Sequence, residues 1–303
     1  MAMVSNISYI PAKKNSKIFI HLTATTLTLP KGASGDPASV GIAALLIGQT
    51  YPEYTAAAER QEAHLINDVP RWPNGAISQR EAYAELWADF VYMAPPFLAY
   101  YAVATTDVDL LKQAAQQCLL YHDVLSTDLG PWHHIIGPES QDLGLWSTGN
   151  GWAAAGMARV LATMMKSPFA EATKNEQDAL IADIKAIIDG AIILDTDSSG
   201  LLRNYLNDTT WFGETSGTAM LTATLYRMAV LAPSTFGAKY TSWANEKIQV
   251  VNNCINTTTG IVAPAINPLS WGDRTPFTTG SPEGQSFVVL MHAAYRDWSS
   301  KGD

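Results

Sequence analysis

Segments with helical periodicity fill most of the chain, and the stretches that join them alternate in length and character. The joining segments 123–148 and 195–212 are long and contain Gly, Pro, Trp, His and Asp, whereas 166–174 and 232–238 are short and bland. Long loops at one end and short connectors at the other are what a ring of helical hairpins requires. The sequence therefore predicts an all-α fold. Helices are expected over residues 39–50, 53–67, 83–105, 107–127, 151–166, 175–193, 214–231, 239–256 and 283–297.

Local signals set the limits of some of these elements. Asp107 is well placed as the N-cap of its helix. The pair Pro95-Pro96 predicts a kink in the segment 83–105, or its division in two. The main strand signal is residues 17–29, which are rich in Ile and Thr. Because no low-complexity linker interrupts the chain, we expect an irregular segment over residues 1–38 and one domain over 39–303.

Size and charge exclude several classes of partner. The 303 residues suffice for one large domain with a substantial core. Only 16% of the residues are charged and the net charge is −9, so a nucleic-acid partner is not expected. No apolar run is long enough to span a bilayer, so no membrane partner is expected either. The oligomeric state does not follow from the sequence.

Cysteine usage and the known short motifs indicate no metal site and no cofactor. Cys118 and Cys254 have neither metal-ligand nor redox spacing, and two buried thiols are expected rather than a disulfide. Phosphate-binding loops, nucleophile elbows and zinc-binding motifs are missing from the sequence.

Glycosylation sequons favour an extracellular location. They occur at Asn6, Asn207 and Asn256. The sequence as given opens Met1-Ala2-Met3 without a secretion signal, so a cytoplasmic location stays the alternative.

Two clusters of glycine and aromatic residues lie where helices are expected to begin. Residues 146–152 read WSTGNGW, and residues 211–220 read WFGETSGTAM. Aromatic rings that stack, together with a few amides and hydroxyls, suit a concave sugar-binding site. Each cluster taken alone is equally compatible with an ordinary helix start that carries a core tryptophan.

The same clusters carry a resemblance to a known family, together with two further segments. Residues 87–98 read WADFVYMAPPFL, like that family's Asp-x-x-x-Met-x-x-Pro-Phe, and 281–287 read SPEGQSF before the last helix. Residues 146–152 and 214–220 are similar to its Trp-Gly-Arg-Gly-Asn-Gly-Trp and Glu-x-Ser-x-Thr-Ala-Met. In this combination and order, the chain resembles the unsaturated glucuronyl and galacturonyl (rhamnogalacturonyl) hydrolases of glycoside hydrolase families 88 and 105. The resemblance implies a six-hairpin (α/α)6 toroid.

The chain departs from the family pattern in two places. No opening helical hairpin is recognisable in residues 1–38, so an atypical or incomplete first hairpin is expected. The family carries a second Asp a few residues after a His in the loop before the first cluster. Here that loop reads WHHIIGPESQD over 132–142. With His134 as the family His, Gly137 takes the place of the Asp, and the nearest acids are Glu139 and Asp142.

The resemblance implies that the C4=C5 bond of a terminal unsaturated uronic acid is hydrated, with one carboxylic acid first giving a proton and later taking one from water. The candidate catalytic residues are Asp89, Asp142 and His134. Asp89 lies in an apolar run, where an acid is costly to bury without a purpose or a partner; a helix-capping Asp is the alternative. Asp142 precedes Leu143-Gly144, so turn chemistry is its alternative role.

The candidate substrate-binding residues are aromatic, polar or cationic. Tryptophans offer stacking faces or serve as core anchors, and Asn150 hydrogen-bonds a sugar hydroxyl or caps its helix. Glu214 also suits a helix start. Arg274 pairs with a uronate carboxylate or with Asp273 at the surface. The predicted set is His133, Trp146, Asn150, Trp152, Trp211, Glu214, Thr215, Trp271 and Arg274.

The expected function is that of a glycan-degrading hydrolase whose partner is an oligosaccharide containing uronic acid. Two alternatives remain from the sequence alone. One is a relative with shifted chemistry, a uronide lyase or a different uronidase. The other is a sugar-binding relative without catalysis. Gly137 favours the alternatives, whereas Asp89 and the helix-start clusters favour an enzyme.

Overall fold

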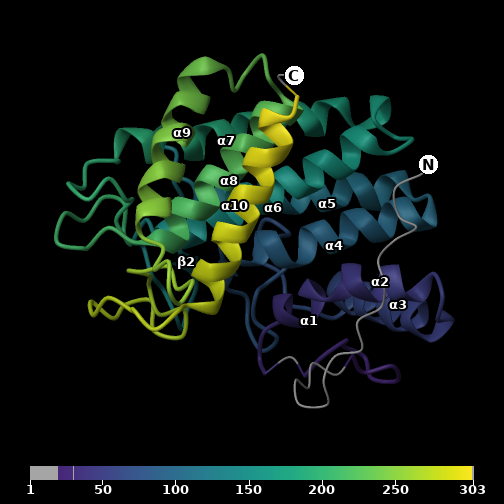
Figure 1. The fold of residues 1–303 in the computed structure, drawn as a ribbon. Helices are drawn as coiled ribbons and strands as arrows, with labels where there is room; N and C mark the ends of the chain where they lie inside the picture. The colour runs from purple at the N-terminus through teal and green to yellow at the C-terminus, as the bar shows by residue number, and fades with distance from the viewer. Residues whose placement is uncertain (1–19, 30, 302–303) are drawn as a thin grey trace.

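The computed structural model describes residues 20–29 and 31–301, and ten α-helices make up most of that part of the chain (Figure 1). A short 3-10 turn, Glu171–Thr173, precedes α7. The only two strands described, β1 (Leu86–Trp87) and β2 (Ile135–Ile136), pair antiparallel. The helices are α1 (Gly35–Ser39), α2 (Gly41–Gly48), α3 (Pro52–Asn67), α4 (Phe90–Thr105), α5 (Val108–Leu125), α6 (Ser147–Lys166), α7 (Lys174–Ile193), α8 (Thr215–Leu231), α9 (Ala238–Asn253) and α10 (Pro282–Ser299).

The helices pair in chain order into hairpins: α2 with α3, α4 with α5, α6 with α7, and α8 with α9. The first members α4, α6 and α8 pack against one another in sequence, and α10 packs on α8. These four helices form the inner wall, and α5, α7 and α9 lie outside it. The predicted all-α hairpin toroid is confirmed. Within residues 20–29 and 31–301 the ring holds four hairpins and a last unpaired helix, so the six-hairpin plan is incomplete in that part.

Several predicted element limits are corrected. The helix expected over 83–105 begins only at Phe90, because the preceding residues form β1. The helix expected from residue 151 begins at Ser147, and residues 35–38, expected to be irregular, are helical in α1. In the expected strand, residues 22–28 form bends and residues 20, 21 and 29 are irregular, while residues 17–19 lie outside the described part. The N-cap at Asp107 is confirmed, because its side chain accepts a bond from the amide of Leu110 at 2.9 Å.

Pro95 and Pro96 do not divide α4, and contacts with α6 explain why they are tolerated. A proline has no amide hydrogen, so the carbonyls of Val91 and Tyr92 lose their usual partners four residues on. Arg159 of α6 donates from Nη1 to the Tyr92 carbonyl at 3.2 Å, and its guanidinium lies 4.5 Å from the centre of the Tyr92 ring. The sequence signal for a break was therefore overridden by tertiary contacts.

Small residues let the inner helices approach closely. A Cβ atom placed on Gly156 would overlap the Val91 carbonyl of α4, and one on Gly217 of α8 would overlap the Ser147 side chain of α6. Close-packed interiors leave no room for an added methyl group at such crossings. The inner wall is thus held together by backbone-to-backbone approach as well as by side chains.

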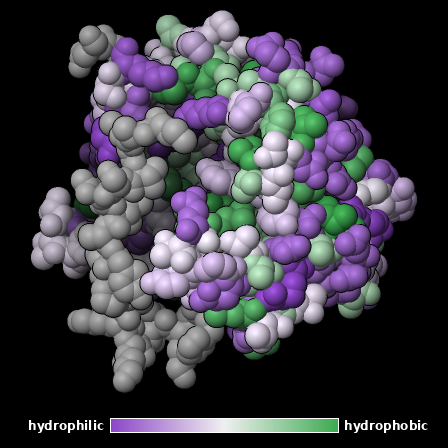
Figure 2. Space-filling view, turned by 90° about the vertical axis from the view of Figure 1, so that its right-hand side faces the viewer, coloured by the Kyte–Doolittle hydropathy of each residue, from purple (hydrophilic) through white to green (hydrophobic). Residues whose placement is uncertain are grey.

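Polar and apolar side chains are interspersed over the face shown in Figure 2. Among the helices that the structure describes, none is long and apolar enough to cross a membrane. Cys118 is buried and Cys254 half-buried, and both are free thiols.

Replacing Gly156 with Ala should destabilise the fold by about 1–3 kcal/mol, because the new methyl group would force α4 and α6 apart. The expected signature is a fall in melting temperature of about 2–4 °C for each kcal/mol. Gly272→Ala is the control, since no atom lies within 4 Å of a Cβ at that position. Equal melting temperatures for the two variants would show that the α4–α6 crossing is not tight.

Candidate active site

The inner helices α4, α6, α8 and α10 begin at the same end of the ring, which we call the mouth. The strand pair brings the segment before α4 against the loop before α6, with Trp87 opposite Ile135. The amide of Ala88 also donates to the carbonyl of His134 at 3.0 Å. Asp89, the residue that precedes α4, is thereby placed beside the His134 ring.

Three of the predicted residues come together as one unit, the His134 triad of Asp89, His134 and Asp142. His134 Nε2 lies 3.3 Å from Asp89 Oδ2, and His134 Nδ1 lies 3.0 Å from Asp142 Oδ2. The His134 side chain is fully buried between the two carboxylates. Asp89 and Asp142 are partly exposed, so the triad faces solvent through its acids.

Asp142 reaches His134 because the loop folds back on itself. Ile135 and Asp142 exchange both backbone hydrogen bonds, at 2.9 and 3.0 Å, and the His134 amide donates to the Gly144 carbonyl at 3.0 Å. The Tyr205 hydroxyl then donates to Asp142 Oδ2 at 2.5 Å. Sequence reasoning missed Tyr205, which lies 63 residues beyond Asp142 and carries no local motif.

Gly137, where the resemblance placed the family's second Asp, packs against Glu85. A Cβ atom there would overlap the side chain of Glu85. Glu85 is fully buried, and its Oε2 accepts bonds from the amides of Glu139 and Ser140 at 3.1 and 2.8 Å. Position 137 therefore belongs to a loop anchored by Glu85, and Asp142 is the second acid at His134.

The triad has a defined charge pattern. Burial disfavours the protonated ring of His134, but its hydrogen bond to Asp142 and the adjacent Asp89 carboxylate outweigh burial and raise its pKa above the ordinary value. Burial likewise opposes ionisation of Asp142, but bonds from His134 and Tyr205 outweigh it and lower the pKa of that carboxyl. Asp142 is therefore an anion near neutral pH, and it stabilises a protonated His134.

Aromatic rings enclose the buried histidine. The ring of Trp146 lies 4.4 Å from that of His134, Trp271 lies 5.2 Å away and Trp87 lies 5.8 Å away, all between centroids. Trp271 also contacts Trp87 at 5.6 Å. Trp146 is almost fully buried, with Nε1 donating to Asn204 at 2.8 Å. Trp87 was not predicted, although it stands two residues before Asp89 in the segment that carries the resemblance.

A surface depression of about 340 Å³ opens beside Tyr205. Its wall includes Trp211, which is only 7% exposed and therefore does not project freely from its loop. Arg274 lies 4.6 Å over the Trp211 ring and 3.5 Å from Asp208. Its surface partner is thus Asp208 rather than Asp273. The residues that line the depression are Gly144, Tyr205, Asn207, Asp208 and Trp211.

Three predicted substrate-binding residues are fully buried and use their polar atoms inside the protein. Asn150 lies within α6, so it is not an N-cap; it bonds the backbone of Trp132 and Trp146. Glu214 caps α8, accepting from the amides of Ser216 and Gly217 at 2.7 and 2.6 Å. The Thr215 hydroxyl donates to the Pro264 carbonyl at 2.8 Å. These three residues lie beneath the surface of the mouth, where their hydrogen bonds hold its backbone in place.

The remaining predicted residues lie apart. The His133 ring contacts the Leu143 carbonyl at 2.6 Å and points away from the triad. Trp152 is half-buried in the lumen of the ring, between Tyr92 at 4.6 Å and Phe287 at 4.7 Å. It contributes to the wall below the mouth and also packs against the cluster of Trp146 and Trp211.

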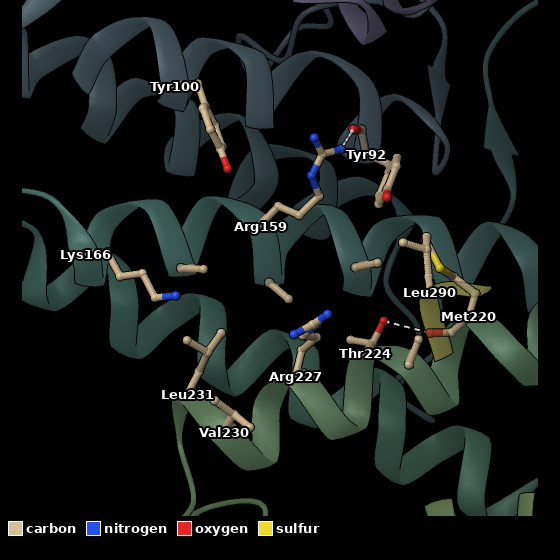
Figure 3. Close-up of a pocket in the computed structure, with 14 residues that line it drawn as sticks. Tyr92, Tyr100, Arg159, Lys166, Met220, Thr224, Arg227, Val230, Leu231 and Leu290 are labelled. Carbon is tan, nitrogen blue, oxygen red and sulfur yellow. Dashed lines mark hydrogen bonds between the residues drawn. The ribbon is translucent and has the colours of Figure 1, made fainter. Parts of the chain in front are cut away.

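A second cavity of about 340 Å³ lies along the lumen, between α4, α6, α8 and α10 (Figure 3). Arg159, Lys166 and Arg227 line it together with Tyr92 and Tyr100. None of the predicted site residues lines this cavity. The carboxylates of the His134 triad lie at the mouth, and no Asp or Glu is among the residues that line this cavity.

The fold and the acid-bearing mouth define a class, the helical-toroid glycan-degrading enzymes. The family model for Glycosyl Hydrolase Family 88 matches residues 37–261, about three quarters of the chain. The protein belongs to this family and is a glycoside hydrolase. A search of curated protein sequences found no match.

Solved structures share the fold at low sequence identity. A glycoside hydrolase of family 105 from C. acetobutylicum is 15% identical, with a TM-score of 0.75 over 92% of this chain and 84% of that one. A possible family 105 member from Salmonella enterica is 21% identical, with a TM-score of 0.72 over 85% and 70%. An unsaturated glucuronyl hydrolase from a Bacillus species, responsible for glycosaminoglycan degradation, is 13% identical, with a TM-score of 0.63 over 87% and 73%. At these identities the likeness shows the fold alone.

The raised pKa of His134 predicts a pH-dependent stability. Because the folded pKa exceeds the ordinary 6.5, the protonated ring stabilises the fold fully below about pH 6.5, and this contribution is lost as pH rises through the folded pKa. In Asp142→Asn the histidine loses its nearest carboxylate, so its pKa should fall. NMR titration of the His134 ring, with unfolding measured at about pH 5.5 and 8.5, tests this.

Asp109→Asn, at an exposed position of α5, is the control and should leave the His134 titration unchanged. An unchanged titration in Asp142→Asn would contradict the charge pattern assigned to the triad.

Proposed function

We propose that this glycoside hydrolase removes a terminal unsaturated uronic acid from an oligosaccharide by hydrating its C4=C5 bond. The observation that carries the proposal is the His134 triad, in which one buried histidine joins two carboxylates at the mouth of the ring. Family membership supports the hydrolase class. The segment 87–98 supports the choice of substrate, through its resemblance to the unsaturated uronyl hydrolases.

The chemistry requires one group that gives and then takes a proton. In the first step a proton is added at C4 of the enol ether, and water attacks C5 while losing its own proton. The product is a hemiketal, which opens and releases the aglycone as an alcohol. A single acid can supply the first proton and accept the second, in contrast to ordinary glycosidases, which need two carboxylates at a set separation.

The geometry supports different roles for the two acids. Asp142 is held as an anion by His134 and Tyr205, so it is poorly suited to give a proton and well suited to orient the histidine. Asp89 touches His134 on the other side and has a partly exposed carboxyl at the mouth. We therefore assign proton transfer at C4 and from water to Asp89, with His134 as its partner and Asp142 as a positioning residue.

The surroundings suit a sugar ring. The depression lined by Tyr205 and Trp211 lies next to Asp142, and Trp87 and Trp271 present aromatic surface beside His134. Aromatic faces stack on the apolar faces of sugars, while polar groups fix their orientation. An oligosaccharide bound here would place its terminal residue over the triad.

One assay separates this proposal from a lyase activity. Hydration destroys the conjugated double bond, so ultraviolet absorbance of an unsaturated disaccharide falls with time. A lyase creates that bond by removing the C5 proton of a saturated uronide and releasing the sugar attached through the C4 oxygen, so absorbance rises. Loss of absorbance with unsaturated glucuronyl or galacturonyl disaccharides is the expected result, and a rise with intact polyuronides would replace the proposal.

Asp89→Asn should reduce turnover of the best unsaturated disaccharide by roughly 10²–10⁴-fold, as expected for a lost general acid/base. The amide keeps the shape of the side chain but cannot cycle a proton. Asp142→Asn should give an intermediate loss, because it weakens the orientation and protonation of His134 without removing Asp89. Steady-state rates at several pH values provide the measurement.

Asp109→Asn serves again as the matched control, and circular dichroism checks that every variant is folded. If the folded Asp89→Asn protein kept wild-type turnover, Asp89 would be structural and proton transfer would have to be reassigned.

A further inference from the structure

Three inner helices begin with the same pattern, an unpaired polar atom on their second residue. These residues are Thr148 of α6, Ser216 of α8 and Glu283 of α10. Thr148 and Ser216 are fully buried. Among the described residues, neither their hydroxyl oxygens nor Glu283 Oε2 has a hydrogen-bond partner. Buried polar atoms without partners are rare, and they call for an explanation.

The three helix starts are adjacent at the mouth. Gly217 contacts Ser147, and a Cβ on Gly284 would lie 2.9 Å from Ser216 Oγ. Four residues further on, the rings of Trp152 and Phe287 meet at 4.7 Å in the lumen. Residues four apart lie on one face of a helix. Thr148 and Glu283 therefore lie on the same lumen-facing sides as these two rings, one turn closer to the mouth.

Glu283 is surrounded by acids rather than by cations. The charged groups that face it are Asp89 at the start of α4 and Glu214 at the start of α8, while α6 presents the uncharged Thr148. Burial first, and then these two carboxylates, raise the pKa of Glu283 to about 7. His134 contacts this group of acids through Asp89, and the Arg80 guanidinium lies 4.5 Å from the centre of the Trp87 ring, which packs beside His134.

A protonated carboxyl differs from a carboxylate in what it can bind. It donates a hydrogen bond, whereas the ionised form only accepts. A uronic acid that enters the mouth brings a negative charge toward Asp89 and Asp142. An ionised Glu283 would add to the repulsion, while a neutral one pairs with the incoming anion.

We propose that Glu283 is a specificity-determining residue whose protonated carboxyl donates a hydrogen bond to the carboxylate of a uronic acid bound at the mouth. Thr148 and Ser216 supply hydroxyls at the same level of the lumen. This inference rests on the proposed function, because it assumes that uronides bind at this end of the ring. The start of α10 thus takes part in recognising the carboxylate of the sugar.

Binding of saturated ligands tests the inference without relying on turnover. Calorimetric titration uses saturated glucuronic and galacturonic acid disaccharides, with a neutral glucose disaccharide for comparison. In the unmutated protein the uronate Kd should weaken about tenfold or more between about pH 6 and pH 8.5, as Glu283 ionises. E283Q carries a donor at every pH, so its Kd should vary far less over this range.

The control is Glu246→Gln, which removes one acid from the exposed surface of α9 and should follow the unmutated protein. The inference is overturned if E283Q keeps the pH dependence of the unmutated protein. It is also overturned if a folded E283Q loses uronate binding at about pH 6, because the donor alone would then not suffice.

Infrared spectra of the unmutated protein and of E283Q, both with labelled glutamate, give a readout independent of binding, because burial also raises the pKa of Glu214. A protonated carboxyl band that disappears between about pH 6 and pH 8.5 should be present in the unmutated protein and missing from E283Q, and the same band in both proteins overturns the inference. Failure of the two proposals is distinguishable. If the protein binds uronates with the predicted pH dependence but does not turn over unsaturated disaccharides, the proposed reaction is wrong and the role of Glu283 in recognition is retained. If the unmutated protein binds no uronate, the inference falls.

Discussion

One buried carboxylate, that of Glu214, holds the mouth of this protein together. It accepts bonds from the first amides of α8 and from the Ser147 hydroxyl at the start of α6, and the amide of Ile266 lies 3.4 Å away. A buried carboxylate without partners would be strongly destabilising, so these donors have to stay in place. Two helix starts and the loop before α10 are thereby fixed relative to one another, and the chemistry is built on that frame.

On this frame the acids reach the mouth by different routes. Asp89 arrives directly, as the residue preceding an inner helix, and Glu283 arrives in the first turn of another. Asp142 comes from a loop that turns back through Ile135 and is secured by Tyr205. Acids of different exposure and proton affinity are thus grouped at the mouth, two of them in contact with one histidine. Such grouping lets neighbouring acids differ in proton affinity within a small volume.

The sequence predicted what depends on local pattern. Apolar periodicity located the long helices, and the cap at Asp107 followed from residue type alone. The prediction failed at Pro95-Pro96, because Arg159, 63 residues after Pro96, satisfies a carbonyl that the prolines leave free. At the site, the family resemblance pointed to Asp89 and His134, and Asp142 was a candidate as one of the acids nearest to Gly137, where the family's second Asp was expected. It could not show that Gly137 points at Glu85, and it gave no sign of Tyr205, since both facts depend on how loops fold in space. Asn150 and Thr215 have residue types that suit sugar binding, but their burial is a property of packing.

The two prolines of α4 have a mechanical consequence for the mouth. Without two backbone bonds, the first turn of α4, which follows Asp89, is less firmly tied to the rest of its own helix, and Arg159 of α6 supplies one of the missing ties. The same guanidinium lines the cavity along the lumen, where Tyr92 lies beside it. The first turn of α4 is therefore tied through a single side chain to the wall of that cavity, so that a ligand or a substitution that moved Arg159 would also loosen the turn beside Asp89.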